Sequence, residues 1–583
     1  VLKLSPGAII ELPKLADEEL EILVANKPIG FSIDLCMKII DKIKRAEGEL
    51  ANAETRKRRV IKPIMARVRN QFLRSHPNAG WYEYEPISRD NEREGTRLVF
   101  GAALRVHPKL DTAGVVACFD ADPLFDHPSS LRLAREFAAS RHPETGTGAR
   151  LYAAESSFSL TGVRADHRLA VPSRRVPLIL ACVAHHLVAE HRLDLPPAAQ
   201  GYAGEAGKDI SDSERAFAEM QAADLASHRG SGVILVGPRQ KPAVHALAAV
   251  LNQVLGATGS SVSYSAEPDP ERPTHMAAIG ALKAAIASGA VETLLILGGN
   301  PVYNAPADLR FGDVLAEVPV SIHLSLYDDE TSQRCTWHLP QAHGLESWGD
   351  GRAWDGTLTM RQPLIAPLYD GRSDIEVLAL VSGSKTTSGY ELVRESLRGS
   401  VATADFEALW RRALHDGTVE GTAWSAVQPR LAPSRLAVAV DGLRALLDAG
   451  LPNAERPEVV LAADSRVWDG RFANNGWLQE LPDPLTKVTW DNALLVSPAT
   501  ARELGISDGE IAAIEARGVA IEAPTFVLPG QARSTMTLAL GYGRTAAGRH
   551  PAIIFAAGHP ASAKPGSSGI PHTHPGCGRV DWL

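Results

Sequence analysis

Residues 293–301 constrain the fold of this chain more than any other segment. An apolar run, Thr-Leu-Leu-Ile-Leu at 293–297, ends directly on Gly298-Gly299-Asn300-Pro301. A buried strand that breaks on two glycines brings bare backbone to the carboxyl end of a parallel sheet, where nucleotide-like ligands bind. A second apolar run, residues 318–326, follows after a short connection and leads into residues 327–331, Tyr-Asp-Asp-Glu-Thr. The segment therefore predicts an α/β domain with a ligand-binding edge.

The sequence before this segment alternates strands and helices. Residues 114–119 and 233–236 are short apolar runs of parallel-strand type, and residues 81–86 also have a strand pattern. A helical pattern opens at Pro242 and stops at Gly256, and a second one runs from 274 to 288. This spacing predicts a doubly wound, mainly parallel sheet.

The pattern changes towards the carboxyl end. Residues 497–505 predict a short helix with Ser497 at its N-cap and Gly505 at its end. The turns Ser507-Asp508-Gly509 and Arg517-Gly518 then separate the strand patterns 510–516 and 519–523. Hairpin spacing of this kind predicts a small, separate β domain.

Residues 337–340, Trp-His-Leu-Pro, and 346–350, Glu-Ser-Trp-Gly-Asp, complete a recognisable order of motifs after the Gly298-Gly299-Asn300-Pro301 turn. This order resembles the molybdopterin oxidoreductases. The sequence of these motifs is most similar to the molybdopterin-oxidoreductase-like (iron–sulfur/molybdopterin fusion) subunit of bacterial alternative complex III, a membrane quinol-oxidising complex. Residues 474–492 resemble the sequence of that subunit most closely, and the resemblance covers roughly residues 76–550.

The resemblance and the length together predict several domains, because 583 residues are too many for one core. We expect the following segments: a divergent, partly helical segment at 1–75, a first α/β domain at 76–215, a second at 216–385, a helical region and linker at 386–455, a C-terminal β-barrel-like domain at 456–550, and an irregular tail at 551–583.

The resemblance also predicts a vestigial pterin-nucleotide pocket. In the family, a turn like Gly298-Gly299-Asn300-Pro301 lies beside the guanosine end of the cofactor, and Thr331 falls in the family's Glu-Thr step. On its own, the motif is more simply a tight turn between sheet and helix, and the resemblance favours the cofactor turn. The earlier turn, Asp120-Ala121-Asp122-Pro123, departs from the family pattern, and two carboxylates there would repel a pyrophosphate. We therefore expect an idle, side-chain-filled cleft that both turns face.

No catalytic residue and no metal site are predicted. The five cysteines are scattered, so the chain has no cysteine run of iron–sulfur type. Consecutive residues such as 328–330 cannot converge on one metal ion from a strand. His572, His574 and Cys577 could supply three ligands, but no fourth lies nearby. The basic end of a charged helical pattern at 34–59 is most simply a solvated helix end.

Trp477 and Trp490 lie in an amide- and indole-rich stretch, residues 474–492, that suits partner docking or internal domain packing. The net charge of −8 gives no reason to expect nucleic acid. No segment approaches the roughly 20 apolar residues that cross a bilayer. No export signal is visible at the amino end of the given sequence.

Two functions follow from the resemblance. The first is a non-catalytic scaffold subunit of a respiratory electron-transport complex, held on the membrane, at its periplasmic face, through its partners. Those partners would be iron–sulfur, multihaem cytochrome c and quinol-binding membrane subunits, with the clusters and haem c on them or on a missing region. The second is a catalytic oxidoreductase that binds molybdopterin guanine dinucleotide, with its metal ligand outside the readable part.

Overall fold

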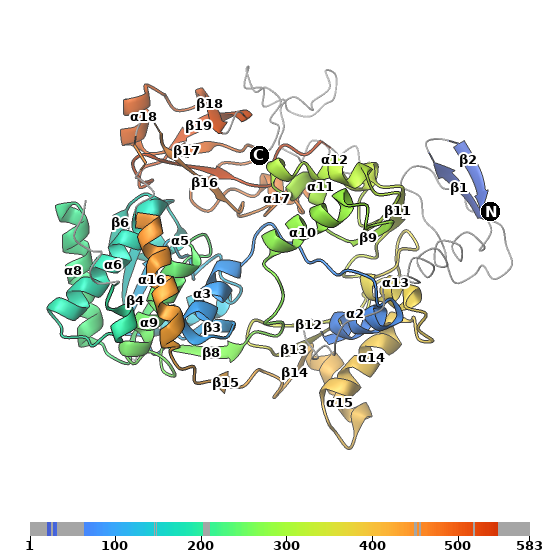
Figure 1. Cartoon of the computed structure of the whole chain (residues 1–583), viewed down its shortest axis with the longest axis horizontal. Coiled ribbons are helices and arrows are strands. Elements are labelled where there is room, and N and C mark those ends of the chain that lie inside the picture. The colour runs from blue at the N-terminus through green and yellow to red at the C-terminus, as the bar shows by residue number, and fades with distance from the viewer. Residues whose placement is uncertain are drawn as a thin grey trace.

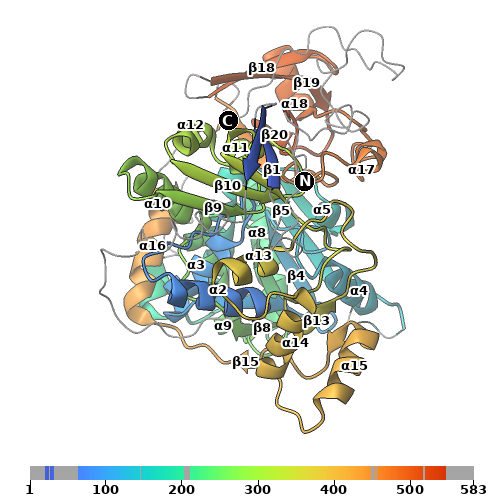
Figure 2. The ribbon, with the colours of Figure 1, turned by 90° about the vertical axis from the view of Figure 1, so that its right-hand side faces the viewer.

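The computed structural model describes residues 63–144, 146, 148–201, 210–447, 452–453, 456–516 and 519–545. It also describes the backbone of one antiparallel hairpin, formed by β1 (Leu20–Val24) and β2 (Lys27–Phe31). Figure 1 shows one body at the left with the C-terminal strands above it and a second body at the right, and Figure 2 shows the molecule turned by 90°. The predicted helix at 34–59, the candidate ligands at 572–577 and the tail at 551–583 lie outside the described residues.

The first body is built on a four-stranded parallel sheet in the order β6-β5-β4-β7. Its strands are β4 (Val115–Phe119), β5 (Arg150–Glu155), β6 (His167–Ala170) and β7 (Gly232–Val236). Each residue of β4 and β7 is buried, as expected of parallel strands covered on both faces. Because β7 pairs with β4 along their full lengths, this sheet continues across residue 215, so no sheet boundary falls at the predicted division between the two α/β domains.

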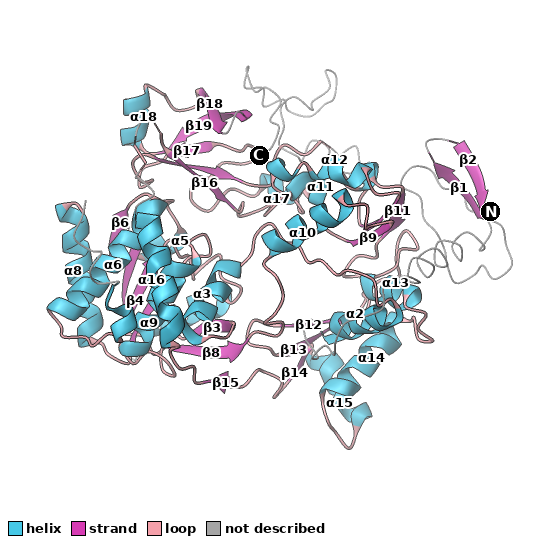
Figure 3. Ribbon diagram, viewed as in Figure 1, coloured by secondary structure: helices cyan, strands magenta, loops and turns pink. Residues whose placement is uncertain are grey.

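Helices cover both faces of this sheet, and most of them gather on one side (Figure 3). They are α3 (Asp90–Phe100), α4 (Ser130–Ser140), α5 (Leu160–Arg164), α6 (Val176–Ala189), α8 (Asp212–Ser227), α9 (Pro242–Val254) and α16 (Pro433–Leu447). The apolar residues of α6, α9 and α16 form one continuous core with the sheet. On α6, His186 is buried and His185 is exposed. A small antiparallel sheet of β3 (Leu104–Pro108), β8 (Val262–Ala266) and β15 (Ala426–Val427) closes one end.

The second body contains a three-stranded parallel sheet in the order β11-β10-β9. Its elements are α10 (His275–Ala287), β9 (Thr293–Leu297), α11 (Pro301–Asn304), α12 (Phe311–Ala316), β10 (Val320–Ser325) and β11 (Trp337–Pro340). Ile279 of α10 and Phe311 and Leu315 of α12 pack on one face of this sheet with Leu294 and Ile296 of β9. The predicted strands and helices between 233 and 326 are thus confirmed within a few residues, but they contribute to two sheets.

A third cluster of helices packs below the second sheet. Its elements are α2 (Pro63–Ser75), α13 (Asp374–Val381), α14 (Gly389–Ser400) and α15 (Phe406–Asp416), with the small antiparallel sheet β12 (Gly349–Arg352), β13 (Leu358–Arg361) and β14 (Thr418–Val419). Leu297, at the end of β9, joins their apolar core. Single 3-10 turns occur at Ser173–Arg175, Pro197–Ala199, Ala307–Leu309 and Ser332–Arg334.

The C-terminal domain is a mixed five-stranded sheet in the order β16-β20-β17-β19-β18. It comprises β16 (Glu458–Ala462), α17 (Gly476–Glu480), β17 (Leu494–Val496), α18 (Pro498–Leu504), β18 (Ile511–Ala516), β19 (Val519–Val527) and β20 (Thr535–Ala539). The Ser497 cap and the left-handed Gly505 are confirmed. Closure into a barrel is not confirmed, since β16 and β18 are the end strands of the observed pairing.

The strand predicted at 81–86 is wrong: these residues have no regular secondary structure. Their side chains act as tertiary anchors instead. Trp81 donates to Glu83 (2.9 Å), Glu83 in turn accepts from Arg69 (3.0 Å), and the Tyr84 hydroxyl donates to the carbonyl of Asn304 (2.7 Å). The predicted helices between 386 and 455 are present, and they divide between the two bodies: α14 packs on α2 and α13, α15 packs on β13 and β14, and α16 packs on α3 and α9 of the first body.

Candidate functional site

The Gly298-Gly299-Asn300-Pro301 turn lies at the carboxyl end of β9, as predicted. Both glycines adopt positive φ (69° and 75°), which side-chain-bearing residues rarely do. The buried His323 on β10 supports the turn, because its Nε2–H donates to the carbonyl of Gly299 (3.0 Å). Burial lowers the pKa of His323 to about 4, so the ring is neutral at pH 7 and acts as a fixed hydrogen-bond partner.

The side chain of Asn300 bonds within the protein through both its oxygen and its nitrogen. Its Oδ1 accepts from the backbone N–H (3.2 Å) and the hydroxyl (2.7 Å) of Thr331, and its Nδ2 donates to Glu330 (2.7 Å). The Thr331 hydroxyl also accepts from the backbone N–H of Val302 (3.0 Å). The structure thus brings the predicted residues Asn300 and Thr331 together, but they bond to each other rather than face an open pocket.

Glu330 extends this contact to the C-terminal domain. Arg544 donates from Nε to both carboxylate oxygens (2.9 and 3.1 Å), and the backbone N–H of Thr545 donates to Oε1 (2.9 Å). Both charged side chains are almost completely buried, with exposures of 5% and 8%. We call Asn300, Glu330, Thr331, Arg544 and Thr545 the Glu330 junction. It joins the second sheet to the end of the C-terminal domain.

Three further contacts stabilise the junction. Tyr303 on α11 donates to the carbonyl of Tyr542 (2.7 Å), and the Arg544 guanidinium lies over its ring at 4.9 Å. Arg544 also donates to the carbonyl of Gly470 (2.8 Å). A Cβ at Gly470 would lie 2.6 Å from the Tyr303 ring, so only glycine permits this approach. Sequence reasoning missed Tyr303, Gly470 and Arg544, because nothing local marks contacts between residues 74 or more positions apart.

The Asp120-Ala121-Asp122-Pro123 turn lies at the carboxyl end of β4, and Asp120 has a left-handed φ of 52°. Its buried carboxylate accepts from the N–H (3.0 Å) and hydroxyl (3.1 Å) of Ser156, the hydroxyl of Ser173 and the amide of Gln240 (2.9 Å). Arg239 lies 3.5 Å away. Although burial opposes ionisation, Arg239 and these hydrogen bonds hold the pKa of Asp120 below its ordinary value. The expectation that Asp120 repels a ligand is therefore wrong, since its charge is neutralised internally.

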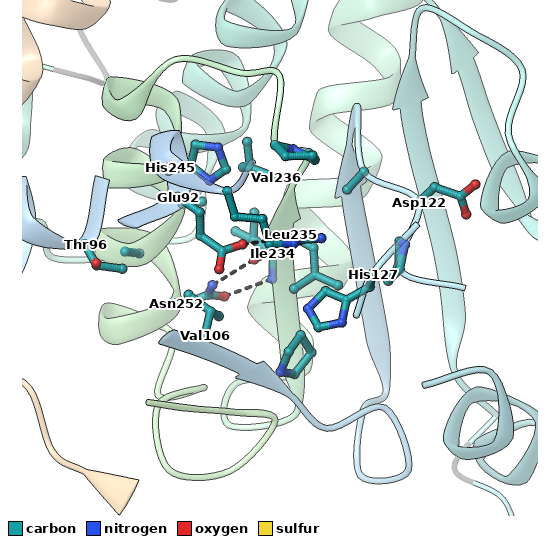
Figure 4. Close-up of a pocket in the computed structure, with 18 of the residues that line it drawn as sticks. Glu92, Thr96, Val106, Asp122, His127, Ile234, Leu235, Val236, His245 and Asn252 are labelled. Carbon is teal, nitrogen blue, oxygen red and sulfur yellow. Dashed lines mark hydrogen bonds and ion pairs between the residues drawn. The ribbon is translucent and has the colours of Figure 1, made fainter. Parts of the chain in front are cut away.

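Asp122 lies beside a cavity of about 50 Å³ open to water-sized molecules. The cavity is lined by Glu92, His127, His245 and Asn252, among others, and by no residue of 298–301, so the two turns do not share it. Figure 4 shows the Asp122 carboxylate turned away from Glu92, His245 and Asn252. It accepts instead from the N–H (3.1 Å) and hydroxyl (2.5 Å) of Thr161. Burial raises the pKa of Asp122 to about 6.

This cavity does not fit a pterin dinucleotide. Pockets for small molecules and cofactors have volumes of roughly 300–1,000 Å³. Two buried histidines line the cavity. Burial lowers the pKa of His245 to about 3 and that of His127 to about 2, so both are neutral. Asn252 is occupied by both backbone groups of Ile234 (2.9 Å each). The space is suited to a few water molecules.

The C-terminal domain also docks on the carboxyl end of the first sheet. The backbone N–H of Ala532 donates to the carbonyl of Ser156 (3.0 Å), and the hydroxyls of Ser157 and Thr537 lie 2.6 Å apart. The N–H of Ser173 donates to Glu458 on β16 (2.7 Å). The edges of both sheets where α/β proteins bind ligands are thus contacted by the chain's own C-terminal domain.

Trp477 and Trp490 differ in their surroundings. Trp477, on α17, is 85% exposed and lies in a stretch with exposed Phe472 and Leu481. Trp490 is half-buried with a positive φ of 64°, and its backbone N–H donates to the carbonyl of Gln479 at the end of α17 (3.0 Å). Trp477 therefore offers an exposed surface, whereas the ring of Trp490 lies near Gly476, the first residue of α17.

In the part of the chain that the structure describes, no group of three or more His, Cys, Asp or Glu side chains is arranged to hold a metal ion. Within the same residues, no helix has the length and apolarity needed to span a membrane.

Comparison with known proteins agrees with the fold. No family model matches the chain. The sequence is 26% identical over 283 residues to the "Menaquinone reductase, molybdopterin-binding-like subunit" of Nitratidesulfovibrio vulgaris, covering 45% of this chain and only 38% of that subunit. The fold is similar to acetylene hydratase from Pelobacter acetylenicus, with a TM-score of 0.61 over 90% of this chain and 85% of that one. The sequences of that pair are 12% identical, so this likeness concerns the fold alone. The sequence likeness to a subunit named as molybdopterin-binding-like and the fold likeness to acetylene hydratase both agree with the resemblance of the motifs to molybdopterin oxidoreductases.

Proposed function

We propose that this chain is a non-catalytic scaffold subunit of a membrane quinol-oxidising respiratory complex of the alternative complex III type. It contributes shape and docking surface to iron–sulfur, multihaem cytochrome c and quinol-binding membrane subunits, which hold it at the periplasmic face of the membrane. The name of the N. vulgaris relative, a subunit of a menaquinone reductase, supports a place in such an assembly.

One observation carries the non-catalytic part of this proposal. At the turn that resembles the family's cofactor-binding turn, Asn300 and Thr331 bond to each other and to Glu330, and Glu330 binds Arg544. A ligand at this turn would have to displace a buried ion pair, and removing one partner of such a pair costs about 3–5 kcal/mol. The donors and acceptors of the turn thus stabilise the protein rather than a cofactor.

The rival function is a catalytic oxidoreductase with a bound molybdopterin guanine dinucleotide. The words "molybdopterin-binding-like" in the relative's name and the similarity to an enzyme fold favour it. The hydrogen bonds of Asn300 to Glu330 and Thr331 and the small cavity beside β4 favour the scaffold.

The docking surface that we assign to a partner subunit is the exposed apolar surface of Phe472, Trp477 and Leu481, whose side chains are 49%, 85% and 52% exposed. Large exposed aromatic residues such as Trp477 are typical of interface anchors. The Trp490 ring lies 3.9 Å from the position of a Cβ on Gly476, so it fixes the base of α17.

Co-purification from the native host tests this function. The wild-type chain should bring down partners that contain haem and labile sulfide, whereas Trp477→Ala should reduce their recovery at least tenfold. Leu131→Ala is the matched control, because Leu131 is 88% exposed on α4, in the first body, and its loss should leave recovery unchanged. Recovery of no redox-active partner by the wild-type chain, or equal recovery by both variants, would contradict the proposal.

A further inference from the structure

Strand β9 has an open edge. It is an end strand of the three-stranded sheet β11-β10-β9, and none of the described residues pairs with its other side. Natural proteins cover or interrupt such edges, since an unpaired row of N–H and C=O groups binds other strands. The edge carries no proline, charge or bulge that would block pairing.

The backbone groups that face this open side can be identified. Gly298 N–H donates to Leu324 on β10, and the carbonyl of Glu292 accepts from Val320 on β10. Because alternate residues of a strand direct their backbone groups to opposite sides, the groups of residues 292, 294, 296 and 298 face β10. Those of Thr293, Leu295 and Leu297 therefore face outward.

The composition of β9 suits an interior position rather than an edge. Its sequence, Thr-Leu-Leu-Ile-Leu, is apolar on both faces, as expected of a central strand in a parallel sheet. All five residues are nevertheless only partly buried, whereas five of the six residues of β10 are fully buried. An additional strand beside β9 would remove this mismatch.

We propose that β1 is this strand, so that the hairpin β1–β2 extends the sheet to the order β11-β10-β9-β1-β2. The β1 sequence, Leu-Glu-Ile-Leu-Val, matches β9 in length and is mostly apolar. Within the hairpin, β2 contains Pro28, which lacks an N–H and suits an outer edge. That leaves β1 as the strand of the hairpin able to pair with β9.

The position of residue 63 supports this occupant. Ile64, at the start of α2, and Leu297, at the end of β9, belong to the same apolar core. The chain that follows the hairpin therefore enters the described body beside β9. The 31 residues between Phe31 and Pro63 could span about 100 Å if extended. The connection is easily long enough.

Disulfide trapping tests the pairing in the full chain. Ile22 and Leu295 are the central residues of two five-residue strands, so in-register pairing places them opposite each other in either orientation. Residues in that relation have Cβ atoms about 4.5–5.5 Å apart, within reach of a disulfide. Ile22→Cys with Leu295→Cys should cross-link on mild oxidation, as read from the linked peptides by mass spectrometry.

The matched control is Ile29→Cys with Leu295→Cys. Ile29 pairs with Ile22 on β2 and would lie two strands from β9, about 9.5 Å away, which is too far for a disulfide. Cross-linking of Ile22 but not Ile29 supports the proposal. Absence of the Ile22 cross-link, or equal cross-linking of both, overturns it.

Hydrogen exchange gives a second, independent readout. Ile22→Pro removes the central N–H of β1 and should speed exchange of the Leu295 and Leu297 amides at least tenfold. Ile10→Pro, outside the hairpin, should not change their exchange. If the outward amides of β9 exchange equally in the wild type and in Ile22→Pro, the hairpin does not cover this edge.

Discussion

Breaking the Glu330 junction should loosen the C-terminal domain. Glu330→Ala removes the acceptor for Arg544 Nε, for the N–H of Thr545 and for the amide of Asn300. At 2.9 Å and an effective dielectric of about 20, the Arg544–Glu330 attraction is about 6 kcal/mol. Desolvation offsets part of this, and the measured cost of leaving one partner of a buried pair alone is about 3–5 kcal/mol. Little solvent screening applies, since the side chains are only 5% and 8% exposed.

The assay is hydrogen exchange of the peptides that contain Tyr303 and Tyr542, on the two sides of the junction. A loss of about 3 kcal/mol corresponds to exchange faster by a hundredfold or more in regions that exchange by local opening. Asp313→Ala is the matched control, because the Arg310–Asp313 pair is exposed (78% and 59%) and should contribute little. Replacing both Glu330 and Arg544 with methionine should restore part of the loss, since no buried charge is then left unpaired.

An acceleration below tenfold for Glu330→Ala, or one equal to that for Asp313→Ala, would refute the reasoning. It would mean that the C-terminal domain is held by its other contacts and that the junction is incidental.

Three further predictions follow from single groups. Asp120→Asn should lower the thermal midpoint, at a cost of about 1–3 kcal/mol, because Ser156, Gln240 and Arg239 lose the carboxylate that they contact. Asp122→Asn should change stability little at pH 7.5, because burial, which raises the pKa of Asp122 to about 6, already disfavours the charge that Asn removes; equal effects of the two variants would contradict this. Gly470→Ala should destabilise the protein by about 2 kcal/mol more than Gly509→Ala in the same thermal assay. Both glycines have positive φ, but of the two only Gly470 faces an aromatic ring, that of Tyr303, and equal stabilities of the two variants would contradict the prediction. Burial lowers the pKa values of His107, His127, His245 and His323 to about 4, 2, 3 and 4, so the unfolded chain binds four protons below pH 6.5 that the folded chain does not, and stability falls with acidification. Burial also raises the pKa values of Asp122 and Asp329 to about 6, so these two carboxylates bind protons first in the folded state. The net difference of about two protons predicts a loss of about 2.7 kcal/mol per pH unit from pH 6 to 4, steeper in Asp122→Asn, and a flat profile from denaturant titrations would refute it.

Local patterns predicted the regular elements well. The helix at α9 was marked by Pro242 and by an apolar face of period 3.6, and β7 and β9 by short apolar runs. These signals depend on residues a few positions apart, so a single sequence contains them. Pairing between strands is a different matter. The pairing of β7 with β4 joins residues more than 110 positions apart, and nothing in either run specifies the other.

The failed strand at 81–86 has the same physical origin. Trp81 and Tyr84 have strand propensity, but their hydrogen bonds to Glu83 and to Asn304 fix an irregular path. Tertiary contacts overrode the local preference.

The candidate site was predicted in position but not in chemistry. The motif placed Gly298-Gly299-Asn300-Pro301 at the end of its strand, and the Glu-Thr step placed Thr331 beside it. The partner that determines what Asn300 does, Arg544 through Glu330, lies 214 residues from Glu330. Likewise, the charge of Asp120 was visible in the sequence. Its contact with Arg239 and its hydrogen bonds from Ser156, Ser173 and Gln240 were not.

The most direct test of the central claim is elemental and pterin analysis of the complex purified from its native host, with the chain quantified by amino-acid analysis. The scaffold account predicts molybdenum and tungsten far below one atom per chain and no pterin released on denaturation, with iron accounted for by the partner subunits. One atom of molybdenum or tungsten per chain, together with extractable pterin guanine dinucleotide, would contradict it and establish the turn at Asn300 as part of a working cofactor site.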